Sequence, residues 1–184
     1  MCYEKLSPSL CAFTSQLFGM DIPKNAKNAL NVLEWKEAVL EEMGALEKKI
    51  RLGKVVNLLE GKSTIGCKWI FTVKYNSDGL LERYKAPLVA KGFTQTYGID
   101  YSETFAPMAK LNRVRVLLSI VANLDWTLQQ LDVKNAFLNG DLEKEVYINS
   151  PPSFSRRFDS KECKLRNSLY ELKQSPKAWF EKFT

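Results

Sequence analysis

The sequence predicts an α+β domain. Apolar residues recur at helical spacing near residues 32–51 and again from residue 110, and between these stretches apolar and polar residues alternate as in a strand pair. Helices and strands that follow one another, together with a hairpin, are typical of the α+β class. The 184 residues are enough for one domain with a core of its own.

The first expected helix covers about residues 32–51. Its apolar face would carry the residues that recur every three or four positions, which are Trp35, Val39, Met43, Leu46 and Ile50. Residues 1–30 show no sustained periodicity. We therefore interpret 1–30 as a leader or linker and 31–184 as the folded domain.

A long basic hairpin is expected next. Aromatic and apolar residues alternate with mostly polar ones in residues 67–75, and the alternation returns in residues 80–93. Between them lies a turn sequence, Asn76-Ser77-Asp78-Gly79.

Four further elements follow the hairpin. A helix should begin near Lys110, a strand of roughly residues 127–132 should end in Asp132, and a short strand is expected near Val146. Ser175 and Pro176 should open a final helix, with serine as the cap and proline at the first helical position.

Positive charge is concentrated in one stretch. The net charge is +6, and residues 48–93 contain ten lysines and arginines against three acids. A stretch of this kind suits a phosphate backbone. The alternative is a solvated strand surface, and charge alone does not separate the two.

Several classes of protein are disfavoured by composition. The chain has no histidine, and its four cysteines form no Cys-x-x-Cys pair. This excludes histidine-based catalysis and argues against a zinc site. No apolar run approaches the roughly 20 residues of a membrane span. The first ten residues do not resemble a secretory signal, so we expect a cytoplasmic or nuclear protein.

Asp132 is the one candidate for metal chemistry. A carboxylate at the end of an apolar strand, followed by a tight turn, can hold a hard divalent cation. Taken alone, such an aspartate more often simply caps a turn.

Five segments, in order, resemble copia-type retrotransposon reverse transcriptases over about residues 33–184. The most specific is Asp132-Val133-Lys134-Asn135-Ala136-Phe137-Leu138-Asn139-Gly140, which is similar to the first catalytic motif of that family. The other four lie at residues 66–74, 84–93, 100–107 and 168–176, the last reading Ser168-Leu169-Tyr170-Glu171-Leu172-Lys173-Gln174-Ser175-Pro176.

The resemblance implies part of a right-hand polymerase. The fingers would comprise about residues 31–107 and 141–175, and an incomplete palm about residues 108–140 and 176–184. The family reaction transfers nucleotides from deoxynucleoside triphosphates to the 3′-hydroxyl of a DNA primer on an RNA template, and pyrophosphate leaves. It uses two magnesium ions, and the intact element carries further polyprotein domains.

Site residues follow from the same resemblance. Asp132 and the carbonyl of Val133 would bind metal, and Ala136 and Phe137 would border the incoming nucleotide, with Phe137 excluding a ribose 2′-hydroxyl. The alternative for Phe137 is a plain core aromatic. The remaining implied contacts are those of Lys85 and Lys91 with phosphates, and those of Tyr170 and Gln174 with the template. The alternatives are template-backbone contact or solubility for the two lysines and a packed aromatic for Tyr170.

Some positions depart from the family pattern. Pro87 stands where the family has arginine, Glu171 stands where it has glycine, and residues 51–60 fit poorly. The second metal-binding motif of the family ends in two adjacent aspartates, and no such pair occurs in this chain.

Three interpretations remain: part of an RNA-directed DNA polymerase, a remnant that only binds nucleic acid, and a degenerate transposon relic. The chain by itself is expected to be inactive.

Overall fold

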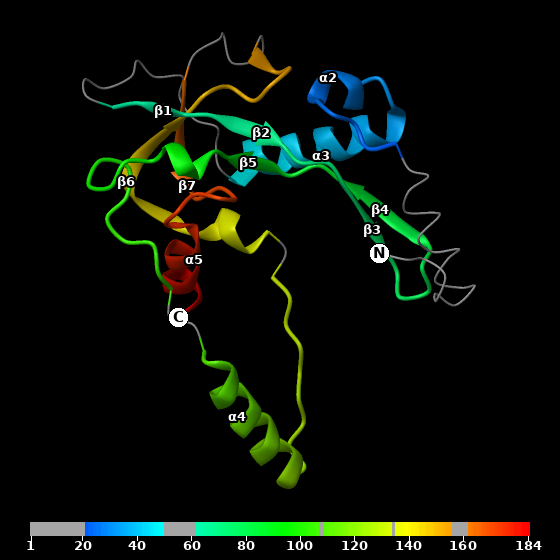
Figure 1. The fold of residues 1–184 in the computed structure, drawn as a ribbon, viewed down its shortest axis with the longest axis vertical. Helices are drawn as coiled ribbons and strands as arrows, with labels where there is room; N and C mark the ends of the chain where they lie inside the picture. Colours follow the sequence, from blue (N-terminus) through cyan, green and yellow to red (C-terminus); the bar gives the residue numbers. More distant parts are fainter. Residues whose placement is uncertain (1–20, 50–61, 107–108, 134, 156–161) are drawn as a thin grey trace, which may run out of the picture.

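The computed structural model describes residues 21–49, 62–106, 109–133, 135–155 and 162–184. Helices and strands are mixed along the chain, which confirms the predicted α+β class. None of the helices in this described part is long and apolar enough to cross a membrane. Figure 1 shows one body of strands and helices from which a single helix, α4 (Leu111–Asn123), stands apart.

The N-terminal helices supply one wall of the core. A short helix, α2 (Ala26–Ala29), is capped by Asn25, whose side chain accepts a hydrogen bond from the N–H of Asn28. It leads into α3 (Leu33–Lys49), which confirms the first predicted helix. Four of the residues predicted for its apolar face are buried, namely Trp35, Val39, Met43 and Leu46, whereas Ile50 lies outside the described residues.

The predicted hairpin is present, but its two arms are each divided. The outgoing arm consists of β2 (Cys67–Trp69) and β3 (Thr72–Tyr75), and the returning arm of β4 (Leu81–Lys85) and β5 (Leu88–Ala90). β2 pairs with β5 and β3 with β4, both antiparallel. Its inner face packs against α3, where the Trp35 ring meets those of Phe71 and Tyr84 edge-on.

A separate three-stranded sheet completes the core. It has the order β1–β6–β7, built from β1 (Thr64–Ile65), β6 (Asp141–Ile148) and β7 (Cys163–Asn167). β1 is parallel to β6, and β7 is antiparallel to it. β6 confirms the strand predicted near Val146. Because Gly66 alone separates β1 from β2, the chain passes directly from this sheet into the hairpin.

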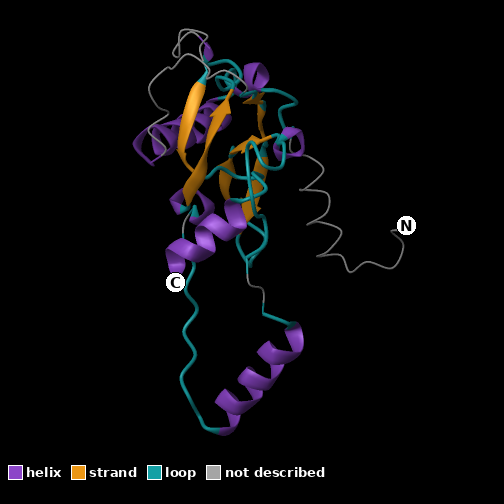
Figure 2. Ribbon diagram, turned by 90° about the vertical axis from the view of Figure 1, so that its left-hand side faces the viewer, coloured by secondary structure: helices purple, strands orange, loops and turns teal. Residues whose placement is uncertain are grey.

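Residues 111–133 lie outside the core, and we call this segment the arm. α4 confirms the predicted helix, yet only Val121 of its apolar residues is buried, and the two views in Figures 1 and 2 both place it away from the body. The strand predicted at 127–132 is wrong, because these residues form no strand and remain exposed. A strand requires a neighbour to receive its hydrogen bonds, and none of the described strands pairs with this segment.

The last helix, α5 (Ser175–Phe183), begins one residue earlier than predicted. Gln174 is its N-terminal cap residue, and Ser175 is the first helical residue. The serine hydroxyl does not cap the helix because it donates a 2.6 Å hydrogen bond back to the carbonyl oxygen of Leu169. Gly140 packs against this helix, where a side chain on it would meet the backbone of Ala178.

Candidate nucleotide and nucleic-acid interface

The outer face of the hairpin is basic. Strand alternation directs Cys67 and Trp69 toward the core, so Lys68 between them points outward. The same alternation applies along the rest of the hairpin. We call the four outward cations Lys68, Lys74, Arg83 and Lys85 the basic face. Lys74 lies directly opposite Arg83 in the ladder, an arrangement that costs stability because like charges repel. Folding alone therefore does not explain this concentration of charge.

Lys91 lies just beyond β5, at the end of the hairpin nearer the sheet. Its backbone N–H donates a 2.7 Å hydrogen bond to the carbonyl oxygen of Gly66. Its aliphatic stem passes over Gly66, where an added Cβ would lie 3.1 Å from the Lys91 Cδ atom. The stem is thus held in place while the residue remains exposed to solvent.

Phe137 and Tyr170 meet beside the hairpin. Asn135, in the left-handed conformation with φ of 56°, turns the chain into the short 3-10 helix η3 (Ala136–Asn139). The Phe137 ring stands edge-on to the Tyr170 ring, with 5.9 Å between centroids. The Tyr170 hydroxyl donates a 3.1 Å hydrogen bond to the Asn135 side-chain oxygen. Three residues from two of the family-like segments therefore form one cluster.

Tyr170 also connects this cluster to the hairpin. The Ala90 N–H donates a 2.9 Å hydrogen bond to the Tyr170 carbonyl oxygen. Burial, with a smaller contribution from the Glu42 carboxylate, raises the pKa of Tyr170 to about 12, so its hydroxyl is protonated at neutral pH. Lys85 and Asn135 line the same pocket between α3 and β4, which brings a cation of the basic face near the cluster.

Gln174 lies inside the protein. Its side-chain nitrogen donates to the Asp100 carbonyl oxygen at 3.1 Å, and its side-chain oxygen accepts from the Gln95 amide at 2.9 Å. Gln95 is also buried, and its oxygen accepts the Lys173 N–H. These bonds give Gln174 a positioning role in the loop before α5. A direct template contact, as the resemblance implied, requires this network to open.

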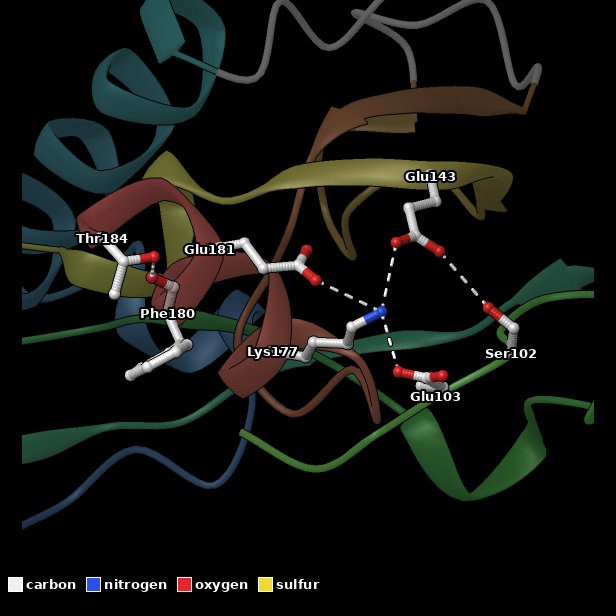
Figure 3. A network of polar contacts seen from close by, with 7 residues as sticks. All are labelled: Ser102, Glu103, Glu143, Lys177, Phe180, Glu181 and Thr184. Atoms are coloured by element: carbon white, nitrogen blue, oxygen red, sulfur yellow. Dashed lines mark hydrogen bonds and ion pairs between the residues drawn. The ribbon is translucent and has the colours of Figure 1, made fainter. Parts of the chain in front are cut away.

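Lys177 of α5 contacts three carboxylates, two of which come from other segments. Its ammonium group lies 2.9 Å from Glu103, 3.2 Å from Glu143 and 3.3 Å from Glu181, as Figure 3 shows. Hydrogen bonds to Glu103 and then Glu143 raise the pKa of Lys177 above its ordinary value. Because Glu103 lies in a loop and Glu143 in β6, the lysine ties α5 to these two segments, whereas Glu181 is one turn further along α5 itself.

Pro87 divides the hairpin. The register on both sides places Pro87 opposite Ile70, and the Ile70 N–H donates to the Pro87 carbonyl oxygen at 3.0 Å. Proline has no N–H to return that bond, so the ladder is interrupted at this pair.

Glu171 occupies a backbone conformation that favours glycine. Its φ is +64°, which costs a residue with a side chain roughly 1–2 kcal/mol. Its carbonyl oxygen fits against Gly92, where an added Cβ would lie only 2.0 Å away. Its carboxylate lies 3.8 Å from the Lys68 ammonium group, with both side chains 50% exposed. An ion pair this exposed contributes about 0–1 kcal/mol and does not offset the strain.

Comparison with known proteins then decides the family. A family model described as "Reverse transcriptase (RNA-dependent DNA polymerase)" matches residues 51–184. The chain belongs to the copia-type reverse transcriptase family. It is 44% identical over 86% of its length to the "Retrovirus-related Pol polyprotein from transposon RE1" of Arabidopsis thaliana and 40% identical over 92% to that from transposon RE2. It is 45% identical over 88% to that from transposon TNT 1-94 of Nicotiana tabacum.

This reverse transcriptase chain spans a small part of those relatives, covering 11% of the RE1 polyprotein and 12% of each of the other two. No solved structure matches it. The fold described above therefore rests on this chain's own structure.

Asp132 and Val133 lie in the exposed part of the arm. The described residues contain no group of three or more carboxylate, thiol or imidazole side chains able to hold a metal ion. A magnesium ion prefers six oxygen ligands, so one carboxylate and one carbonyl do not form a complete site. Their metal-binding role stays a prediction.

Three contributors to the site were not predicted from the sequence. Asn135 fixes Tyr170, Gln95 pairs with Gln174, and Lys68 faces Glu171. The tolerance of asparagine for left-handed turns is a signal that could have indicated Asn135. A buried amide pair has no periodic signature, so Gln95 could not have been found in this way.

Proposed function

We propose that this chain forms the fingers and part of the palm of an RNA-directed DNA polymerase. Its partners would be an RNA template, a DNA primer and deoxynucleoside triphosphates, together with the other domains of a retrotransposon polyprotein. The observation that carries the proposal is the bond from Ala90 to Tyr170, because it joins the basic hairpin to the Phe137 cluster. The cations proposed to bind phosphate and the aromatic wall would thus belong to one structural unit.

Within that unit, we propose that Phe137 selects the sugar. Its ring is half-buried and is held edge-on by Tyr170, which in turn is fixed by Asn135. A rigid ring beside the sugar of a nucleotide would clash with a 2′-hydroxyl, and Ala136 would border the same position. Lys85, near Asn135, and Lys91, beyond β5, are the proposed phosphate contacts, since fixed cations stabilise charge where it develops.

For metal chemistry, we propose that Asp132 contributes one carboxylate and Val133 one carbonyl to a site completed in the whole polymerase. The two magnesium ions of the family would there neutralise charge on the transferred phosphoryl group. The chain has no adjacent aspartate pair, and Asp132 is exposed on the arm. We therefore propose that these 184 residues alone do not catalyse polymerisation.

Binding of the 184-residue chain to fluorescent RNA and single-stranded DNA tests the proposal. If about three phosphates are neutralised, log affinity should fall against log salt with a slope of roughly −2 for a single strand. Lys85→Glu combined with Lys91→Glu should weaken binding to all sequences alike and flatten the slope. The control, Lys27→Glu with Lys36→Glu, makes the same charge change at exposed positions on α2 and α3.

An equal loss of affinity in both double variants would show that the effect comes from net charge alone. A folded chain that binds neither nucleic acid at low salt would refute the proposal and leave the transposon relic as the better account. Circular dichroism establishes that each variant folds.

A second candidate function is a non-catalytic nucleic-acid-binding module. Asp132 is exposed and belongs to no group of three or more possible metal-binding side chains in the described residues, which favours this candidate. Binding without primer extension would be its signature.

A further inference from the structure

Glu171 reaches the basic face from a distant part of the chain. It belongs to the loop between β7 and α5, and two contacts place this loop beside the hairpin. The Ala90 N–H binds the Tyr170 carbonyl oxygen, and Gly92 packs directly against the Glu171 carbonyl oxygen. The backbone that carries Glu171 is therefore fixed relative to β2 and β5.

The side chain of Glu171 then meets one member of the basic face. Its Oε2 atom lies 3.8 Å from Nζ of Lys68, and both side chains are half exposed. Arg83 lies 3.4 Å from the carboxylate of its sequence neighbour Glu82. Among the described residues, Lys68 is thus the member of the basic face whose carboxylate partner comes from another segment of the fold.

Stability does not explain this pairing. The ion pair is too exposed to offset the left-handed backbone of Glu171, and the residue makes its close contact with Gly92 through its main chain. A neutral or smaller residue could occupy the position. What the carboxylate changes is the charge available on the surface that the proposed function assigns to nucleic acid.

We infer that Glu171 is an internal competitor for Lys68, holding that lysine away from the phosphates of a bound nucleic acid. The inference rests on the proposed function and specifies how it is limited in this chain. A phosphodiester carries one negative charge and would bind Lys68 where the glutamate carboxylate now lies. While the carboxylate remains, a phosphate must compete with it for Lys68, so this lysine contributes less to counterion release than a cation without a nearby carboxylate.

The test is a salt titration of the 184-residue chain with a fluorescent single-stranded RNA, followed by anisotropy. Glu171→Gln removes the charge and keeps the size of the side chain. Freeing Lys68 for one further phosphate should steepen the slope of log affinity against log salt by about 0.7. Glu37→Gln, an exposed site on α3, makes the same change in net charge and should leave the slope unaltered.

A second variant tests the partner. Lys68→Gln introduced into the Glu171→Gln protein should remove the whole gain, although this double variant has the net charge of the original chain. Equal effects of Glu171→Gln and Glu37→Gln, or a gain that survives the loss of Lys68, would overturn the inference. So would an unchanged slope for Glu171→Gln in a chain that binds RNA. Absence of binding by every variant would instead refute the proposed function, and the inference with it.

Discussion

Ile70 donates its backbone N–H to the carbonyl oxygen of Pro87, and Pro87 cannot return the bond. The ladder has the same register on both sides of this pair, so antiparallel geometry would otherwise allow two hydrogen bonds here. The hairpin is thus one ladder divided at a single pair. At this pair, between β2 with β5 on the sheet side and β3 with β4 at the tip, the ladder keeps one hydrogen bond in place of two.

Replacing Pro87 should change binding more than stability. Pro87→Arg regains a hydrogen bond worth about 0.5–1.5 kcal/mol, but it also frees the unfolded chain, which costs about 0.4–1 kcal/mol. The free energy of unfolding, measured in urea, should therefore stay within about 1 kcal/mol of the original. The new guanidinium on the outer face should steepen the salt dependence of RNA binding by about 0.7. Pro87→Ala restores the N–H alone, and a binding gain as large as that of arginine would rule out the charge explanation.

Glu171→Gly should stabilise the fold. Glycine adopts φ of +64° without steric cost, whereas glutamate pays roughly 1–2 kcal/mol. After loss of the weak Lys68 pair and the greater freedom of glycine in the unfolded state, a net gain of about 0.5–1 kcal/mol is expected in urea unfolding. Glu171→Ala retains the strain and serves as the control. Equal stability of the glycine and alanine variants would show that the backbone is not strained there.

Two glycine-to-alanine changes should act in opposite directions. At Gly92 a Cβ would lie 2.0 Å from the Glu171 carbonyl oxygen, so the loop between β7 and α5 must move and Gly92→Ala should cost about 2–3 kcal/mol. At Gly44, within α3, no atom lies within 4 Å of the added Cβ. Gly44→Ala should therefore gain about 1 kcal/mol from helix propensity. Thermal unfolding followed by circular dichroism measures both, and a harmless Gly92→Ala would contradict the close packing.

Tyr170 should ionise at a higher pH than an exposed tyrosine. Burial first, and then the Glu42 carboxylate, raise its pKa from the ordinary 10.0 to about 12. Because the folded value lies above the unfolded one, the contribution of its hydroxyl to stability is complete below about pH 10 and is lost as the pH rises from about 10 to about 12. Phenolate absorbance should show this late step in the original chain and lose it in Tyr170→Phe. A titration unchanged by Tyr170→Phe would contradict the assignment.

Primer extension should fail with the 184-residue chain. An RNA template, a DNA primer, deoxynucleotides and either magnesium or manganese provide the assay. The expected result follows from the single exposed Asp132, since one carboxylate does not hold two metal ions in register. Reproducible template-dependent extension, abolished by Asp132→Ala, would show that the chain completes a metal site by itself.

Much of the fold could be predicted because its signals are local. The apolar face of α3 follows from residue spacing, and the hairpin follows from alternation around a turn sequence. The strand expected at 127–132 failed for a physical reason. Its apolar pattern is real, but a strand forms only where another strand receives its hydrogen bonds, and this partner cannot be seen in the local sequence.

The site was predicted unevenly for a related reason. Motif similarity selected Phe137 and Tyr170, which the fold does bring together. It could not indicate that Gln174 would turn inward toward Gln95, nor that Glu171 would meet Lys68, because both relations join segments about 80 to 100 positions apart. Such contacts depend on packing in three dimensions.

Natural selection would act on the arm and on the core by different routes. Side chains of α3 and β6 are kept wherever the protein must fold, because they fill the interior. Asp132 and the exposed leucines of the arm do not fill the interior, so under the proposed function they would be preserved by selection for polymerisation. In copies of this gene that have ceased to transpose but still yield a folded product, codons of residues 111–133 should drift at the silent rate while those of the interior lag behind. The ratio of amino-acid-changing to silent substitutions, compared between these two parts, would then distinguish an active element from an inactive copy.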